Sequence, residues 1–127
     1  MNPAAVIDLD HLHRYTGGDP ALDAEIFALF REQCALWMRA LESAGDAESW
    51  KAGTHALKGA ARGVGAFAFA QACEDAETLA GEAGSRVSRA VALETVRSAM
   101  NEALAAIARL DQKAAGTFRA ATSGSAT

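Results

Sequence analysis

The 127-residue sequence contains little cysteine, proline or β-branched residue, and each shortage narrows the possible structures. It has only two prolines and one tyrosine, with few valines, isoleucines and threonines, so a structure based on β-sheets is disfavoured. The two cysteines, Cys34 and Cys73, are far apart and form neither a CxxC motif nor a Cys/His ligand spacing. We therefore expect two buried thiols in a reducing compartment, and no structural zinc site.

The sequence also lacks an excess of positive charge and any long apolar run. Lysine and arginine total 12 against 16 acidic residues, giving a net charge of −4. A general nucleic-acid binder needs the opposite balance, because it contacts phosphates through cations. No apolar segment approaches the roughly 18–20 residues of a membrane span, and the first residues do not resemble a signal peptide. The expected protein is cytoplasmic and binds neither nucleic acid nor membrane.

Abundant alanine and a hydrophobic fraction of 50% favour a helical protein with one domain. Punctuation by glycine and by helix-capping residues divides the chain into five expected helices. Asp19 and Pro20 are typical of a helix start, as is Asp46. The expected helices cover residues 7–15, 20–44, 46–64, 66–80 and 87–113. Gly81 and Gly84 mark the turn before the last of them.

Apolar residues recur at steps of three and four along the four longer helices, which indicates one buried stripe on each. The expected stripes are Leu22, Ile26, Leu29, Phe30, Trp37, Ala40 and Leu41; Trp50, Leu57, Ala61 and Val64, with Thr54 in the same row; Phe69, Cys73, Ala76 and Ala80; and Leu93, Val96, Met100, Ala103, Leu104, Ile107 and Leu110. Such helices predict an all-α antiparallel four-helix bundle with a short extra N-terminal helix, over residues 1–114. Residues 115–127 are small and polar and are expected to form a disordered tail.

The third expected helix carries a second stripe, formed by Lys51, His55, Lys58, Gly59 and Arg62. At about 100° per residue these positions share one face, roughly 120° from the apolar stripe. His55 should therefore be exposed between cations. Two of the three lysines lie here, although the protein is acidic overall.

Gly59 is unusual because glycine inside a helix costs about 1 kcal/mol relative to alanine. One explanation is clearance, since no side chain at this position would obstruct an approach to the His55 imidazole. The other is that Gly59 and Gly63 allow a neighbouring helix to pack closely.

An exposed histidine between cations has a specific chemical use. Neutral imidazole is a nucleophile and accepts a phosphoryl group at a ring nitrogen. Nearby positive charge disfavours imidazolium and so preserves the nucleophile. After transfer, the same cations can form charge-assisted hydrogen bonds with the phosphoryl group.

The segment from Thr54 to Gly59, followed by Gly65-Ala66 and Cys73-Glu74, resembles the signature of histidine phosphotransfer (HPt) domains of multistep phosphorelays. The His-x-Leu-Lys-Gly pattern is complete at residues 55–59, and the resemblance extends over about residues 7–110. It implies a bacterial phosphorelay intermediate in which His55 reversibly accepts a phosphoryl group from one receiver-domain aspartate and passes it to another. The implied partners are response-regulator receiver domains and a hybrid sensor histidine kinase.

The resemblance also implies roles for individual residues. Lys58 is implied to steady the phosphoryl group, and Gly59 is implied to keep the receiver's path clear; Lys51 and Arg62 extend the phosphate- and partner-binding face. Where some family members place glutamine, this chain has Glu77, which cannot donate a hydrogen bond when ionised.

Other chemistry finds little support in the sequence. His11 and His13 fall on different helix faces without partners for a metal, and no nucleotide-binding fingerprint suggests autonomous kinase activity. Any magnesium for transfer should come from the receiver. Two alternatives remain: a non-phosphorylated helical adaptor that binds a partner through the third helix, and an enzyme that uses His55 as a general base. The four long helices can close their own core, so a monomer is expected.

Overall fold

The computed structural model describes residues 6–81 and 86–125, and over these residues the chain is entirely helical apart from its turns. The helices are α1 (Leu9–Thr16), α2 (Pro20–Glu42), α3 (Ala47–Gly63), α4 (Phe67–Gly81) and α5 (Arg86–Ser125). No strand occurs in the described part of the chain. The predicted all-α class is confirmed, and every expected helix is present, with small shifts at the ends of the first four and a longer last helix.

The helix starts follow from local capping chemistry. The Asp19 carboxylate accepts a hydrogen bond from Ala21 N at 3.0 Å, and Pro20 occupies the first helical position of α2. Asp46 caps α3 in the same way, through a 2.7 Å bond from Ser49 N. Both predicted starts are confirmed. In each, a carboxylate beside unpaired backbone amides stabilises the first turn.

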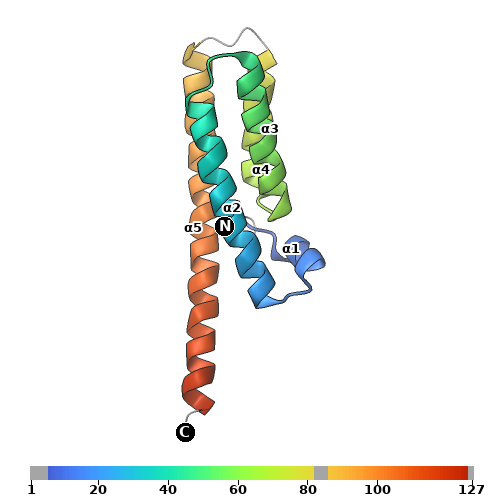
Figure 1. Ribbon diagram of the computed structural model, residues 1–127, viewed down its shortest axis with the longest axis vertical. Coiled ribbons are helices and arrows are strands. Elements are labelled where there is room, and N and C mark those ends of the chain that lie inside the picture. Colours follow the sequence, from blue (N-terminus) through green and yellow to red (C-terminus); the bar gives the residue numbers. More distant parts are fainter. Residues whose placement is uncertain (1–5, 82–85, 126–127) are drawn as a thin grey trace.

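Helices α2 to α5 form an antiparallel bundle in which each helix runs opposite to the one before it (Figure 1). Contacts join α2 to α3, α3 to α4, α4 to α5 and α5 back to α2, which closes the ring. The short α1 packs against α2 at one end. There, Asp8 N donates to Gly65 O at 2.9 Å, and Gly65 adopts a positive φ of 79° in the turn between α3 and α4.

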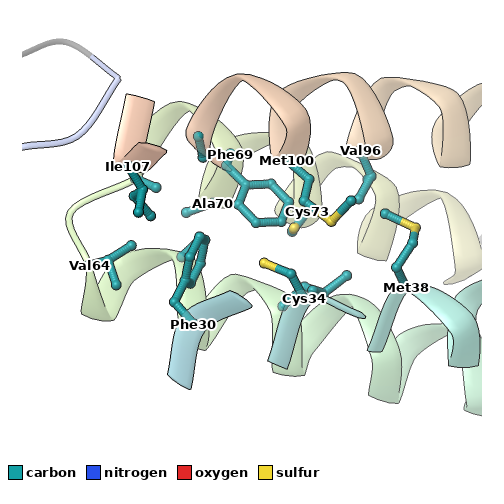
Figure 2. Close-up of a cluster of buried hydrophobic side chains, with 14 of the residues drawn as sticks. Phe30, Cys34, Met38, Val64, Phe69, Ala70, Cys73, Val96, Met100 and Ile107 are labelled. Atoms are coloured by element: carbon teal, nitrogen blue, oxygen red, sulfur yellow. The ribbon is translucent and has the colours of Figure 1, made fainter. Parts of the chain in front are cut away.

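The core lies between the helices and is rich in aromatic and sulfur-containing side chains (Figure 2). The Phe30 ring meets the edge of Phe69, with ring centroids 6.1 Å apart. Cys34 and Cys73 are free, buried thiols on facing helices. Burial raises the pKa of each thiol to about 12. The expectation of two buried thiols agrees with this packing.

The predicted stripes on α3, α4 and α5 are buried or half-buried wherever their side chains are described. The side chain of Ala80 and the predicted turn residue Gly84 lie outside the described residues. On α2 the predicted stripe was partly wrong. Its buried row is Phe27, Phe30, Cys34, Met38 and Leu41. Leu22 and Leu29, predicted to be buried, are 37% and 55% exposed. Apolar residues lie on several sides of α2, so the helical repeat alone could not select the buried side.

Helix α5 continues to Ser125, beyond the end expected near Lys113. The alanines of this segment favour helix, which outweighs the cost of about 1 kcal/mol for Gly116. The helical state of residues 114–125 differs from the disordered tail expected there. The domain boundary at residue 114 remains a prediction.

None of the described helices combines the length and the apolar character that crossing a bilayer requires.

Candidate functional site

The site is built on α3. The side of α3 that is buried in the core determines which of its residues are exposed to solvent. Trp50, Thr54 and Leu57 are at most 1% exposed. The Thr54 hydroxyl donates to Trp50 O at 3.1 Å, so its polar group is satisfied within the helix. With this side anchored in the core, Lys51, His55, Gly59 and Arg62 face outward, as the sequence predicts. Lys58, predicted on the same exposed stripe, is instead largely buried against α4.

A buried hydrogen bond ties α3 to α4 beneath the site. Trp50 Nε1 donates to the carbonyl oxygen of Ala76 at 2.7 Å. Because Ala76 immediately precedes Glu77, this bond also helps to fix the position of Glu77 relative to α3. The two helices pack against each other more extensively than any other pair of described helices.

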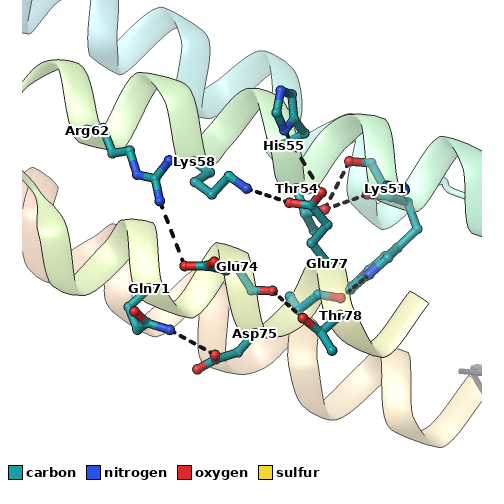
Figure 3. A network of polar contacts seen from close by, with 12 residues as sticks. Lys51, Thr54, His55, Lys58, Arg62, Gln71, Glu74, Asp75, Glu77 and Thr78 are labelled. Atoms are coloured by element: carbon teal, nitrogen blue, oxygen red, sulfur yellow. Dashed lines mark hydrogen bonds and ion pairs between the residues drawn. The ribbon is translucent and has the colours of Figure 1, made fainter. Parts of the chain in front are cut away.

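His55 is the exposed centre of the site. Its side chain is 73% exposed, and Figure 3 shows the imidazole standing away from α4. Nδ1 lies 3.9 Å from Glu77 Oε1, which is too far for a hydrogen bond. The remainder of the ring, including Nε2, is open to an approaching group.

Lys58 lies beneath the exposed face and bonds to α4. Its ammonium donates to Glu77 Oε2 at 2.9 Å, and the two side chains are only 14% and 18% exposed. The hydrogen bond from Lys58 lowers the pKa of Glu77, assisted by the positive charges of Lys58, His55 and Lys51. Glu77 is therefore a carboxylate at neutral pH, with one oxygen bonded to Lys58 and the other facing His55.

The two outer cations of the stripe flank this centre. Lys51 is exposed and borders a shallow depression shared with His55, Glu77, Glu48 and Ala52. Arg62 is half-exposed, with its guanidinium 3.8 Å from Glu74 Oε2 on α4. The structure thus brings His55, Lys51 and Lys58 around Glu77, and holds Arg62 further along α3 beside Glu74.

Gly59 leaves the approach to His55 open. A Cβ atom built on it meets nothing within 4 Å, and the same holds for Gly63. Neither glycine is therefore needed for close helix packing in this structure. Of the two explanations considered for Gly59, packing loses its support, and clearance stays a prediction.

The other histidines belong to local contacts near α1. His13 Nε2 lies 3.1 Å from Asp23 Oδ2, linking α1 to α2. The His11 ring meets Tyr15 and Phe67 edge-on, with centroids 5.4 Å and 5.0 Å away. Among the described side chains, no three histidines, cysteines or carboxylates gather in a way that could hold a metal ion.

Sequence reasoning predicted that these residues share one face of α3, but it missed the contact between Lys58 and Glu77. The Lys58–Glu77 pair joins residues on different helices, and nothing in the spacing along α3 predicts it. The signal present in the sequence was Glu77 on α4, at the position where some members of the resembled family place glutamine.

Comparison with known proteins agrees with this geometry. The model of the Hpt domain family matches residues 24–112. The crystal structure of histidine phosphotransferase ShpA from Caulobacter crescentus is similar, with 37% sequence identity and a TM-score of 0.68. The alignment covers 89% of this chain and 98% of that protein. A search of curated proteins found no significant match.

Proposed function

This chain belongs to the Hpt domain family, as its sequence resemblance predicted, and we propose that it is a phosphorelay intermediate that carries the phosphoryl group on His55. The observation that supports this most directly is the 73% exposure of the His55 side chain on a rigid helix. Gly59, one turn further along α3, adds no side chain to the approach. A bulky partner can therefore bring an acyl phosphate to the imidazole.

The proposed chemistry needs only a neutral imidazole from this chain. An unprotonated ring nitrogen attacks phosphorus, and a nitrogen–phosphorus bond forms as the phosphorus–oxygen bond to the receiver aspartate breaks. The aspartate leaves as a carboxylate, and the ring proton stays on the other nitrogen. Since Nδ1 faces Glu77 and Nε2 faces outward, we assign the attack to Nε2. The reverse reaction delivers the group to a second receiver.

The cations of the stripe support the phosphoryl group electrostatically. We assign this role to Lys58 and Lys51, with Arg62 contributing to the surface that meets the partner. Magnesium for the transfer is assigned to the receiver. The protein needs no nucleotide site for this role, so labelling by ATP alone is not expected.

The proposed partners are receiver domains of response regulators and of a hybrid sensor histidine kinase, acting in the cytoplasm. Small residues lie around His55 on α3, among them Ala52 and Gly59, which are exposed. The adjacent helix α2 also exposes apolar side chains, among them Leu29 and Leu36. A face of this kind suits docking of a folded domain better than binding of a small molecule.

Phosphate incorporation separates this proposal from a helical adaptor that is never phosphorylated. A receiver domain is first labelled with radioactive acetyl phosphate, purified, and mixed with this protein. We expect acid-labile label on the wild type and none on His55→Gln, whose helical circular dichroism should be unchanged.

His13→Gln is the matched control, because it alters a histidine that faces Asp23 away from the site. It should accept label like the wild type. Acid-labile label retained by His55→Gln would assign the phosphoryl group to another residue. Failure of a panel of receivers to label the wild type would favour the adaptor.

A further inference from the structure

The two carboxylate oxygens of Glu77 face two different groups of the proposed phosphorylation site, the Lys58 ammonium and the His55 ring. Oε2 accepts a hydrogen bond from the Lys58 ammonium at 2.9 Å, while Oε1 lies 3.9 Å from His55 Nδ1 (Figure 3). The carboxylate thus stands between the residue that would carry the phosphoryl group and the cation expected to steady it. Both Lys58 and Glu77 are largely shielded from water.

This arrangement creates a competition once His55 carries a phosphoryl group. The ammonium of Lys58 can remain with Glu77, in which case the phosphoryl charge lacks its nearest cation. Alternatively it can turn to the phosphoryl oxygens, which leaves the half-buried Glu77 carboxylate without its hydrogen-bond donor. Glu77 also repels the phosphoryl group directly, because both are negative. Each outcome raises the free energy of the phosphorylated state.

We propose that Glu77, by retaining Lys58, lowers the equilibrium occupancy of phosphohistidine at His55, so that the protein favours donating its phosphoryl group over storing it. The inference rests on the proposed function and deepens it. It concerns the position of the equilibrium and leaves the identity of the phosphorylated residue unchanged. In the donating step, the bond between His55 nitrogen and phosphorus breaks, and the oxygen of the receiver aspartate forms the new bond to phosphorus.

The surrounding charges do not remove this bias. Lys51 is exposed to solvent, where water and salt screen its charge. The Arg62 guanidinium is held 3.8 Å from Glu74, away from the His55 ring. Lys58 is the cation most shielded from solvent in the stripe, so its attachment to Glu77 has the largest electrostatic consequence.

Glu77→Gln tests the role of the charge while it keeps the shape of the side chain. Glutamine can still accept a hydrogen bond from Lys58 through its one oxygen, but it no longer holds Lys58 by charge, and its NH2 group replaces the other carboxylate oxygen. The measurement is the equilibrium ratio of phosphorylated to free protein, after exchange with a phosphorylated receiver domain at about pH 8.5, where free imidazole is neutral. We expect Glu77→Gln to raise this ratio about three- to tenfold, the range for partly exposed charges.

Asp75→Asn is the matched control, because it also removes one negative charge from α4. Asp75 is exposed and accepts a hydrogen bond from Gln71, without contact to a cation of α3 in the described structure. Its equilibrium ratio should stay within about 1.5-fold of the wild type, as expected for a screened surface charge. An equal increase of the equilibrium ratio in both variants would show that the effect depends only on the net charge of the protein. That result would overturn the proposal.

The retention of Lys58 is isolated by repeating the substitution in a Lys58→Met background. Methionine keeps much of the stem and removes the ammonium. Direct repulsion by Glu77 is then still present, but no cation can be released. The effect of Glu77→Gln should therefore be at least about twofold smaller without Lys58. Equal effects in the two backgrounds would mean that direct repulsion by Glu77 explains the whole effect. They would overturn the proposal that Glu77 acts by retaining Lys58.

Phosphoramidate separates failure of this inference from failure of the proposed function, because it phosphorylates histidine without a partner. Phosphorus NMR then gives the phosphohistidine fraction at a fixed phosphoramidate-to-ammonia ratio. A larger fraction in Glu77→Gln, with no exchange between any receiver and the wild type, supports the inference and contradicts the relay. Exchange with a receiver but equal fractions in both proteins supports the relay and overturns the inference. Absence of phosphohistidine under both conditions overturns both.

Discussion

A Cβ atom added to Gly53 of α3 would stand 2.7 Å from Cδ2 of Leu41 on α2. Gly53 is buried, so α2 and α3 approach each other closely only because this position has no side chain. Gly59, six residues further along the same helix, has open space around it. Two glycines within one helix thus have different surroundings: Gly53 lies where α2 packs closely, and Gly59 lies in open space.

Gly53→Ala is expected to destabilise the protein although alanine favours helix. The added methyl group overlaps Leu41, and such overpacking typically costs 1–3 kcal/mol, against a gain of about 1 kcal/mol in helix propensity. We expect a net loss of about 1 kcal/mol in the free energy of unfolding. Urea denaturation followed by circular dichroism measures it, and a variant more stable than the wild type would contradict the packing role.

Gly59 should behave in the opposite way. Gly59→Ala is expected to be neutral or to stabilise by up to about 1 kcal/mol, because it meets no neighbour. Gly59→Glu should keep the fold but slow transfer from a receiver, since reacting atoms must come within about 3–3.5 Å. Lys58→Ala should slow transfer less, because it leaves access open. Wild-type transfer by Gly59→Glu, or a much lower melting temperature, would contradict the clearance argument.

The two core thiols should resist modification in the native protein. Burial raises the pKa of Cys34 and of Cys73 to about 12, so very little thiolate is present at pH 8. We expect Ellman's reagent to react with neither thiol in buffer and with both in guanidinium chloride. Rapid reaction of either thiol in the folded protein would show that the core opens far more readily than its packing indicates.

Acid should weaken the link between α3 and α4. The Lys58 hydrogen bond lowers the pKa of Glu77 in the folded state, so the stabilisation is fully present above the ordinary pKa of about 4.3. It is lost as pH falls through the lower, folded value. The difference in free energy of unfolding between wild type and Glu77→Gln should be constant from about pH 5 to 8 and shrink below about pH 4. A difference that grows in acid would have the wrong sign.

We expect a monomer at micromolar concentration. The exposed leucines of α2, Leu22, Leu29 and Leu36, are seven residues apart, which places them about 10.5 Å from one another along the helix. This row is narrow, whereas a stable dimer usually buries roughly 800 Å² on each partner. Sedimentation equilibrium should give a mass near 13.2 kDa. A mass twice as large, lost in Leu29→Glu, would identify the row as a dimer interface.

The sequence was sufficient to predict which residues share the face of α3 around His55, because every relation involved lies within one helix. His55, Gly59 and the buried Trp50 are related by the helical repeat alone. The helical repeat does not suffice for α2. Its leucines and its aromatic residues lie on different sides of the helix, and only contact with other helices determines which side is buried. The bond between Lys58 and Glu77 depends on the register of α3 against α4, which the Trp50–Ala76 contact helps to fix across 26 residues of sequence.

In the proposed relay, the placement of His55 on one firmly anchored helix also sets the order of events. Donor and recipient must reach the same imidazole from the same side, so each excludes the other while it is bound. The carrier then works in alternation, and the first partner must leave before the second arrives. The throughput of such a relay depends on how quickly each encounter ends, and tight binding to either partner would slow the signal.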